Sequence, residues 1–296
     1  MNFIKHDEPC AVDYVSFVYV AQSTPPSRES VKAGGVATFV NGRLAITCRH
    51  TLDDFIDRLG TGTPVTEKDT AIGMVTQSNA GFSLTGIQHT ETEAALWSIR
   101  RTFRCSDSDL ALLLVAPASE GAQRLDDKKI GVAKIRLALP QEGEKVFAYG
   151  FAGSDILTAS PEKLAIRLMS YTSEGIVNAV HPSGRDKLMP FPCFQTSCRF
   201  DSGMSGGPIF NSAGELCGVI ASGYDVEDGA DPISYGAAVW PILSMTINAD
   251  LPDAPKGEFY TVYDLACRKE KFLHVADLDA IERIPLPNGQ TAWRFK

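Results

Sequence analysis

Clusters of basic residues are missing from this sequence. Its 28 lysines and arginines stand against 36 aspartates and glutamates, a formal net charge of −8, and no stretch gathers the basic ones. A chain without a basic patch lacks the electrostatic footprint of a nucleic-acid-binding protein. We therefore expect no nucleic-acid partner, and we attribute the acidic balance to solubility.

Long apolar runs are also missing. Residues 1–10 include Asp7 and Glu8 and have no apolar core, so they do not have the pattern of a secretory leader. The longest early apolar run, Tyr14 to Ala21, is too short to span a bilayer and predicts a first strand. We therefore expect a cytoplasmic protein with no membrane contact, in a compartment that keeps thiols reduced.

Metal-binding patterns are the third absence. The sequence has seven cysteines, an odd number, and no CxxC or histidine pair accompanies Cys193 and Cys198. We expect small buried thiols and no metal site. No pattern in the chain calls for a cofactor.

Short apolar segments between turn signals are what the sequence has in quantity. Asn41-Gly42 lies between two of them and predicts a hairpin. A short helix is expected over Thr51 to Leu59. Further strands are predicted over residues 71–76, 82–88, 109–115, 146–151, 164–171, 175–180, 194–197, 208–210, 216–222 and 235–239. Short strands at this density predict an all-β fold built from barrels.

A serine between glycines dominates the stretch Asp201-Ser202-Gly203-Met204-Ser205-Gly206-Gly207-Pro208. Glycine at 203 allows the peptide to turn without a Cβ clash, so that two backbone N–H groups can face one developing oxyanion. The pattern G-x-S-x-G also fits the nucleophile elbow of α/β-hydrolases, which needs a helix after the serine and a histidine later in the chain. Here the residues after Gly207 predict a strand, so partners for Ser205 are expected upstream.

Two upstream segments supply such partners. Leu44 to His50 is an apolar strand that ends in Thr-x-x-His, and Asp109 begins the apolar strand Leu-Ala-Leu-Leu. The order His50, Asp109, Ser205 is that of chymotrypsin-like serine proteases and not of subtilisins or α/β-hydrolases. Over about residues 12–245 the chain resembles this family, and in style it is similar to bacterial HtrA-like trypsin-like peptidase domains without a PDZ domain.

This resemblance implies two six-stranded antiparallel Greek-key β-barrels within a peptidase domain over residues 1–248. Barrel one is expected at about 12–120 and barrel two at about 128–248, with the family's final helix over 241–248. Residues 249–296 lie beyond the resemblance, and their many aromatic residues exclude a disordered tail. We expect a short C-terminal extension packed on the body as a helix and a hairpin around Asn288-Gly289, a surface on which a regulatory protein partner is possible.

The resemblance also implies roles for the three residues. The chain would be a serine endopeptidase acting on protein or peptide substrates through an acyl-enzyme, with Ser205 as nucleophile and His50 as general base. Asp109 would orient His50, while Asp107 competes for that role from two residues away; the buried strand that follows Asp109 favours 109. The oxyanion hole would be the N–H groups of Gly203 and Ser205. A His50 with an unshifted or slightly raised pKa predicts an activity step near about pH 7.

Two departures from the secreted trypsins concern activation and specificity. Met204 replaces the aspartate that pairs with a new N-terminus after zymogen cleavage, which puts such activation in doubt. In the family pattern the specificity pocket is lined by Arg199, Phe200, Ser202, Ala221, Ser222 and Gly223. Arg199 stands where proteases that cut after Lys or Arg carry a carboxylate, so we expect no Lys/Arg specificity. An inward Arg199 would favour acidic residues and an outward one small or medium apolar residues, whereas a one-residue loop shift would bring Asp201 into the pocket.

Two alternative functions remain open. One is a catalytically silent binding module that keeps the fold and uses its cleft or tail to hold a partner; the intact residue set argues against it. The other is a non-proteolytic serine hydrolase such as an esterase, against which the triad order and the strand after Ser205 argue.

Overall fold

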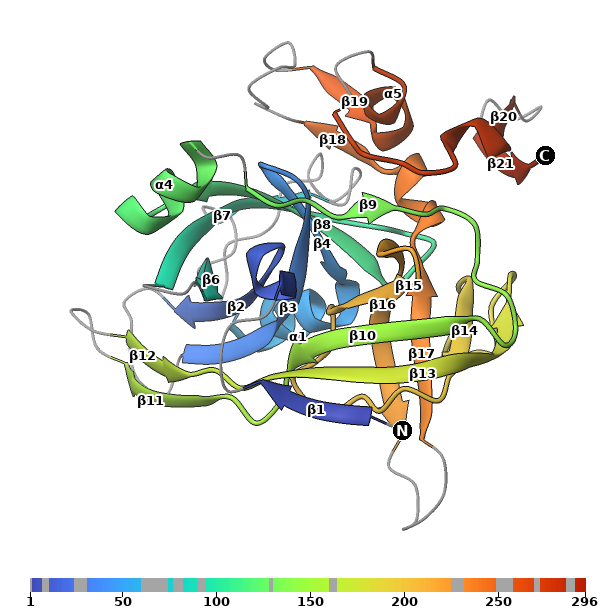
Figure 1. Ribbon diagram of the computed structural model, residues 1–296. Coiled ribbons are helices and arrows are strands. Elements are labelled where there is room, and N and C mark those ends of the chain that lie inside the picture. Colours follow the sequence, from blue (N-terminus) through green and yellow to red (C-terminus); the bar gives the residue numbers. More distant parts are fainter. Residues whose placement is uncertain are drawn as a thin grey trace.

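Two β-barrels lie side by side, with the C-terminal residues packed against them at one end (Figure 1). The computed structural model describes residues 2–6, 11–23, 31–59, 74–76, 82–89, 94–127, 130–159, 164–224, 232–248, 258–268, 272–285 and 291–296. Strands dominate, as the density of short apolar segments predicts, and the all-β fold class is confirmed.

Six antiparallel strands close barrel one. Around the ring they are β2 (Ser16–Ser23), β3 (Val31–Asn41), β4 (Leu44–Cys48), β8 (Leu110–Pro117), β7 (Ala94–Arg104) and β6 (Phe82–His89), which pairs again with β2. The short strand β5 (Met74–Thr76) extends the sheet at β7. The turn at Asn41-Gly42 joins β3 to β4 as the hairpin signal predicts.

Barrel two closes in the same ring order. Its strands are β10 (Lys145–Phe151), β13 (Ser170–His181), β14 (Cys193–Thr196), β17 (Ile233–Ala238), β16 (Glu215–Tyr224) and β15 (Pro208–Asn211), which pairs again with β10. In both rings the third strand along the chain pairs with the sixth and the fourth pairs with the first, which is the Greek-key arrangement. The two six-stranded barrels of a chymotrypsin-like fold are therefore confirmed, although the sequence shows no internal repeat.

Strands β4 and β8 show why these segments are apolar throughout rather than alternating. Ala45 and Leu113 belong to the core inside barrel one, whereas Ile46 and Leu112 belong to a second core shared with barrel two and the C-terminal residues. Because neighbouring side chains on a strand point to opposite faces, a strand covered on both faces needs apolar residues at every position. These two strands therefore lie at the interface of the barrels, where they end beside the candidate site.

The remaining strands lie around the barrels. β1 (Asn2–His6) pairs with β13 on the outside of barrel two, and β9 (Lys134–Ile135) runs parallel to β16. β11 (Asp155–Ala159) and β12 (Leu164–Arg167) form a hairpin, so the single strand expected over 164–171 is wrong: the chain leaves β12 before it enters β13. β7 also lies in a stretch for which no strand was expected.

Within the described ranges the helices are few and short. α1 (Arg49–Leu59) follows β4 as expected, and α4 (Glu120–Asp127) lies on the connection between the barrels. Single 3-10 turns occupy Ala11–Tyr14, Trp240–Ser244 and Leu278–Ala280. The helix expected over 241–248 is wrong. Only the 3-10 turn forms, because residues 246–248 extend as β18 (Thr246–Asn248) to pair with β19 (Phe259–Thr261).

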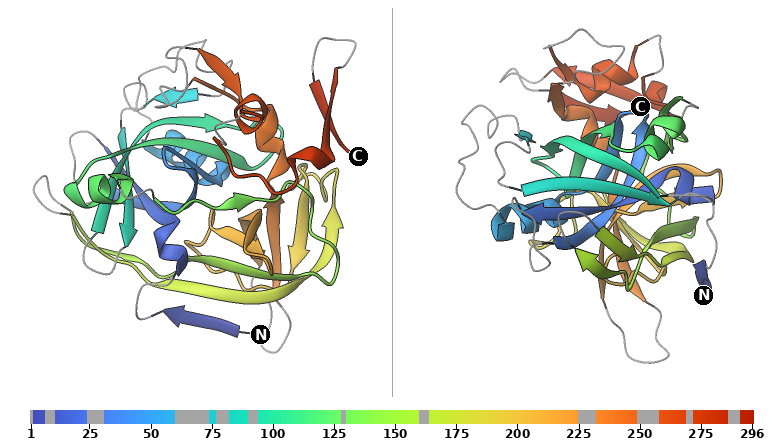
Figure 2. Two further views of the ribbon diagram at one scale, coloured as in Figure 1. Left: turned by 45° about the horizontal axis from the view of Figure 1, so that its top comes forward. Right: turned by 90° about the vertical axis from the view of Figure 1, so that its left-hand side faces the viewer.

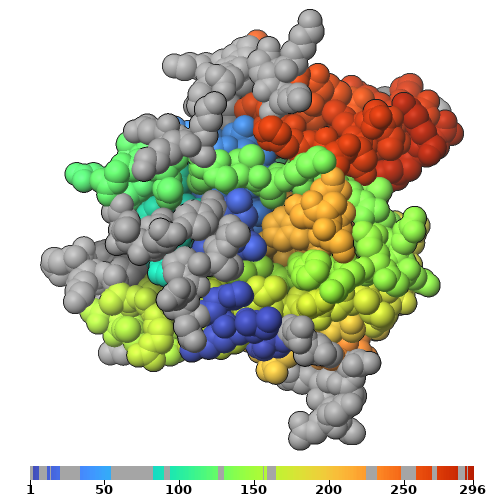
Figure 3. All heavy atoms as spheres, viewed as in Figure 1, coloured from blue at the N-terminus to red at the C-terminus, as the bar shows by residue number. Residues whose placement is uncertain are grey.

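The C-terminal residues pack against the barrels through α5 (Val262–Ala266). Its buried side chains Val262 and Leu265 belong to the same apolar core as Leu216 of barrel two. β20 (Ile281–Pro285) and β21 (Thr291–Phe295) form an antiparallel hairpin at the end of the chain, and the turn predicted at 288–289 lies outside the described residues. Figures 2 and 3 show this segment against the end of the molecule opposite to β1.

Candidate active site

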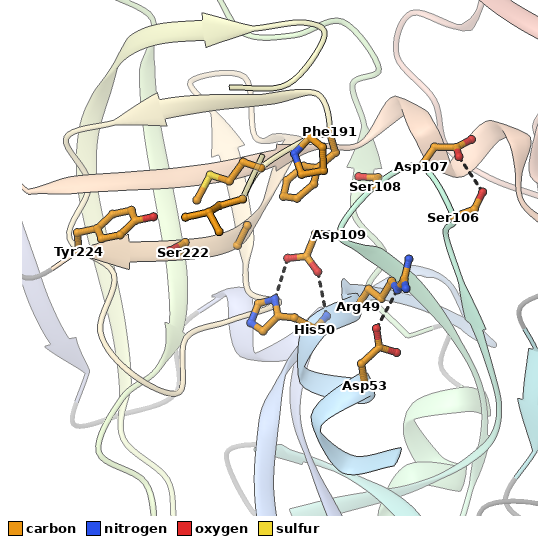
Figure 4. Close-up of a pocket in the computed structure, with 14 residues that line it drawn as sticks. Arg49, His50, Asp53, Ser106, Asp107, Ser108, Asp109, Phe191, Ser222 and Tyr224 are labelled. Atoms are coloured by element: carbon orange, nitrogen blue, oxygen red, sulfur yellow. Dashed lines mark hydrogen bonds and ion pairs between the residues drawn. The ribbon is translucent and has the colours of Figure 1, made fainter. Parts of the chain in front are cut away.

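The end of β4 and the start of β8 bring His50 to Asp109. β4 pairs with β8 up to Cys48 and Leu110, and the next residues are held by a bond from the Arg49 N–H to the Asp109 carbonyl (3.1 Å). The Asp109 carboxylate accepts the His50 backbone N–H at 2.9 Å through Oδ1 and lies 2.7 Å from His50 Nδ1 through Oδ2. One carboxylate therefore fixes both the backbone and the ring of His50 (Figure 4).

Asp107 lies apart from this pair. Its side chain is exposed and accepts a hydrogen bond from the Ser106 hydroxyl at 2.9 Å. Asp109, with 12% of its side chain exposed, is the carboxylate that meets His50. The apolar residues after Asp109 explain the difference, because they anchor that end of the segment in the buried strand β8.

The surroundings of His50 raise its pKa. Burial disfavours the charged ring, but the bond to Asp109 and the proximity of Cys48 outweigh it and raise the pKa from 6.5 to about 11. The Cys48 Sγ lies 3.8 Å from Nε2, the ring nitrogen that does not face Asp109. The ring thus holds a proton more firmly than a free histidine does, and only its deprotonated form can accept one during a reaction.

Ser205 lies in a tight loop between β14 and β15. The loop turns through two glycines with positive φ, +96° at Gly203 and +83° at Gly206. Met204 is fully buried in the core of barrel two, and its backbone N–H donates to the Asp201 carbonyl at 3.1 Å. Gly203 and Gly206 therefore stand at the two positions of this loop where the backbone conformation would strain a residue with a Cβ.

The Ser205 loop packs directly against the strands that present His50. The Ser205 carbonyl accepts the Val36 N–H at 2.9 Å, and a Cβ on Gly206 would stand 2.2 Å from Thr47 Oγ1 and 3.2 Å from the Cys48 nitrogen. Only glycine permits this approach between the two barrels. The structure therefore brings the loops of Ser205 and His50 together, while within its described part no hydrogen bond joins Ser205 Oγ to His50 Nε2.

A buried polar cluster lies beneath the junction of the two loops. The Tyr19 hydroxyl, with no exposed surface on its residue, hydrogen-bonds to Thr51 Oγ1 and accepts from Thr47 Oγ1 at 3.4 Å. Thr47 also bonds to the Val36 carbonyl at 2.6 Å. This cluster connects Thr51, in the first turn of α1, with β3, whose Val36 N–H donates to the Ser205 carbonyl. Sequence reasoning missed it, since a tyrosine in an apolar strand carries no local sign of such a role.

Arg199 turns away from the space beside Ser205. Its guanidinium bonds Asp201 at 2.8 and 3.0 Å and lies over the ring of Phe3, 4.6 Å from its centroid. Of the two orientations left open by the sequence, the structure has the outward one. The same pair occupies the Asp201 carboxylate, which therefore does not enter the pocket.

The remaining predicted pocket residues come from two segments that meet. Phe200 is buried, and its carbonyl would stand 2.5 Å from a Cβ on Gly223, so the loop before Ser205 lies against β16. Ser202 is exposed. Ala221 and Ser222 reach a cavity of about 850 Å³ beside His50 and Asp109. The structure thus places Ala221 and Ser222, but not Arg199, Phe200 or Ser202, on the wall of that cavity.

Sequence reasoning missed most of the wall of this cavity that faces His50 and Asp109 (Figure 4). It consists of Leu188, Met189, Pro190 and Phe191, in the loop before β14, and Tyr224 at the end of β16 (Figure 4). Leu188 is 81% exposed. The signal was the apolar run Leu-Met-Pro-Phe-Pro outside any predicted strand. An exposed apolar wall next to a histidine is suited to apolar side chains of a ligand.

Comparison with known proteins agrees with this geometry. Residues 35–219, more than half of the 296-residue chain, match the family model of the trypsin-like peptidase domain. The chain belongs to the trypsin-like peptidase family. The matched segment of this peptidase domain contains His50, Asp109 and Ser205.

Other comparisons add little to the family match. The HtrA-type protease AlgW, in a structure with a decapeptide, is 14% identical over 76% of this chain, with a TM-score of 0.44. The chain spans 60% of the length of that protein. No curated protein matches its sequence.

Among the residues that the structure describes, no three or more His, Cys, Asp or Glu side chains gather where they could hold a metal ion. No helix in the described ranges is long and apolar enough to cross a membrane.

Proposed function

We propose that this member of the trypsin-like peptidase family is a serine endopeptidase that uses Ser205, His50 and Asp109. The observation that carries the proposal is the double hold of Asp109 on His50, 2.9 Å to the backbone nitrogen and 2.7 Å to Nδ1. A carboxylate on Nδ1 leaves Nε2 to receive a proton and stabilises the imidazolium that results. The approach of the Ser205 loop to the end of β4 supports Ser205 as the proton donor.

The reaction is a double displacement. Ser205 Oγ forms a bond to the carbonyl carbon of the substrate while its proton passes to His50 Nε2. The carbonyl π electrons move onto the oxygen, which the N–H groups of Gly203 and Ser205 stabilise. The C–N bond then breaks, and His50 gives its proton to the departing amine. Water next attacks the acyl carbon, gives a proton to His50, and the C–Oγ bond breaks as Ser205 regains that proton.

We propose further that the enzyme cuts after small or medium apolar residues and not after Lys or Arg. The outward Arg199 supports this, because it engages the Asp201 carboxylate, which could otherwise receive a basic side chain. Ala221 adds apolar surface to the cavity beside His50. The apolar wall at residues 188–191 fits apolar residues that precede the cut.

Mapping of cleavage sites tests both statements. A denatured proteome is incubated with the purified wild type and with Ser205→Ala, and new N-termini are identified by mass spectrometry. Cuts after apolar residues with the wild type alone are expected. Equal cutting by Ser205→Ala would contradict the nucleophile, and dominant cutting after Lys and Arg would contradict the pocket.

A further inference from the structure

The N-terminal strand β1 lies on the outside of barrel two, next to the loop that leads to Ser205. It pairs antiparallel with β13, with Phe3 opposite Ser173 and Ile4 opposite Thr172. β1 is an added edge strand, since the barrel is already closed by its six strands. In Figure 1 it lies at the bottom of the molecule, and Figure 3 shows it on the surface of barrel two.

Phe3 connects this strand to Arg199. Its ring stacks on Tyr171, with centroids 4.7 Å apart and an interplanar angle of 10°. The Arg199 guanidinium lies over the same ring, 4.6 Å from its centroid. A planar guanidinium over an aromatic face gains from the ring quadrupole and loses freedom to rotate.

Arg199 in turn holds Asp201. Nε and one terminal nitrogen of Arg199 donate to the two carboxylate oxygens of Asp201 at 2.8 and 3.0 Å, a fork-to-fork pair that fixes the plane of the carboxylate. The Arg199 backbone N–H donates to the buried Ser173 Oγ at 2.7 Å. An exposed ion pair alone orders a loop weakly. Because Phe3 stacks on the Arg199 guanidinium and Ser173 accepts from the Arg199 backbone N–H, the pair of Arg199 and Asp201 is held in one geometry.

Asp201 defines the turn that contains Gly203. Its backbone N–H lies 3.3 Å from Met204 Sδ, and its carbonyl accepts the Met204 N–H at 3.1 Å. Gly203 lies within this turn, with a φ of +96°. A change in the position of Asp201 therefore changes the direction of the Gly203 N–H.

We propose that β1 is a positioning element for the oxyanion hole: Phe3, through Arg199 and Asp201, holds the Gly203 N–H in its working direction. This inference rests on the proposed serine-protease function. Phe3 and Arg199 are positioning residues, because neither touches the reacting atoms. Met204 carries no charge with which a terminal ammonium could pair. In this proposal β1 orders the loop instead, through the stacking of the Arg199 guanidinium on Phe3.

The test compares two residues of the same strand that face opposite ways. Phe3→Ala removes the ring under Arg199, while Ile4→Ala removes a side chain that is 52% exposed on the other face. With a peptide substrate, kcat is expected to fall about 10-fold in Phe3→Ala, a fraction of the 10²–10³-fold for loss of one oxyanion donor, with KM within about twofold. Ile4→Ala is expected to match the wild type.

Further variants separate this role from simple packing. Phe3→Tyr keeps the ring and is expected to keep kcat, whereas Phe3→Leu keeps apolar volume without a π face and is expected to lose kcat as Phe3→Ala does. In the double variant Phe3→Ala/Arg199→Ala, kcat is expected to equal that of Arg199→Ala. Wild-type kcat in Phe3→Leu, or additive losses in the double variant, would overturn the proposal. Phe3→Leu also serves if Phe3→Ala does not fold.

Hydrogen exchange of the backbone gives a readout that needs no activity. Amides of residues 202–205 are expected to exchange faster in Phe3→Ala and Phe3→Leu than in the wild type and Ile4→Ala. If the wild type cleaves nothing but this difference appears, the serine-protease proposal fails, and Phe3 orders residues 202–205 without an oxyanion hole to serve. If the wild type cleaves and the Phe3 and Ile4 variants agree in both kcat and exchange, the positioning role is overturned.

Discussion

At the scale of single residues, Asp109 determines what His50 can do. Its two oxygens bind the backbone N–H and Nδ1 of His50, so the same carboxylate positions the main chain and fixes the orientation of the ring. A second contact comes from Cys48, whose Sγ lies 3.8 Å from Nε2. His50 is therefore a base whose proton affinity is raised from both sides of the ring.

The pH profile reports this affinity. Only the neutral ring can accept the Ser205 proton, so kcat/KM of the free enzyme rises with pH through the pKa of His50. Because Asp109 and Cys48 raise that pKa above 6.5, to about 11, we expect kcat/KM to rise still between pH 7 and 9, later than the step near 7 expected from the sequence. Cys48→Ala removes one contributor and should move the rise to lower pH. A wild-type profile that is level above pH 7 would contradict this.

Tyr19→Phe tests the buried polar cluster. The change removes one hydroxyl with little change in volume and takes one hydrogen-bond partner from Thr47 and from Thr51, each of which keeps a backbone carbonyl as acceptor. We expect the free energy of unfolding in urea to fall by about 0.5–1.5 kcal/mol, the net contribution of a hydrogen bond. Tyr224→Phe, at a tyrosine that is 44% exposed, is the matched control and should leave the urea midpoint unchanged. Equal midpoints for all three proteins would show that the cluster adds no stability.

At the scale of elements, the contact of the Ser205 loop with β3 and β4 depends on Gly206. A Cβ there would stand 2.2 Å from Thr47 Oγ1 and 2.3 Å from the Val36 carbonyl, with φ at +83°. Gly214 has a similar φ of +73° in the turn between β15 and β16, with nothing within 4 Å of its Cβ position. Substitution of the two glycines therefore distinguishes the cost of backbone strain, which both share, from the cost of a clash between the barrels, which only Gly206 has.

We expect Gly214→Ala to cost about 1–2 kcal/mol of stability, the cost of a left-handed conformation for a residue with a Cβ. Gly206→Ala adds a clash with fixed backbone and should cost roughly 3 kcal/mol or more, with loss of activity. Thermal unfolding and peptide hydrolysis of both variants measure the difference. Similar stability and activity in the two variants would mean that the loops do not pack as described.

The elements also show what the sequence could predict. β3, β4 and β8 carry local signals, an Asn-Gly turn and apolar runs, and the structure has strands there. The 3-10 turn and β18 over residues 240–248 were not predicted, because β18 depends on pairing with β19, a strand outside the segment itself. The approach of Asp109 to His50 was expected from the resemblance that the order His50, Asp109, Ser205 carries. The apolar wall at Leu188 and the contacts of Tyr19 and Phe3 could not be expected, because they depend on packing between distant segments.

At the scale of the whole molecule, two barrels with the same order of strands meet along β4, β8 and β16. The C-terminal residues cover one end of the apolar core that the two barrels share. The site lies where the strands of both barrels end. Stability of the whole therefore comes from apolar packing. The six cysteines that the structure describes are all free thiols, five of them buried.

Reducing agents should consequently leave the molecule unaffected. We expect the Tm with and without dithiothreitol to agree within about 2 °C, because no bond between described cysteines constrains the unfolded chain. Differential scanning calorimetry of the full chain measures this, and gel mobility with and without reductant is the companion assay. A clear fall of Tm in reductant would mean that a disulfide contributes to the stability of the fold.

Labelling by a fluorophosphonate tests the central claim most directly, because the probe reacts with a serine that a neighbouring base activates and needs no knowledge of the substrate. The account predicts that intact-mass and peptide analysis of the wild type find one adduct, on Ser205. It predicts no adduct in Ser205→Ala and labelling slowed by roughly 10³-fold in His50→Ala, because the two residues act as a unit. An unlabelled wild type, or equal labelling of Ser205→Ala, would contradict the account.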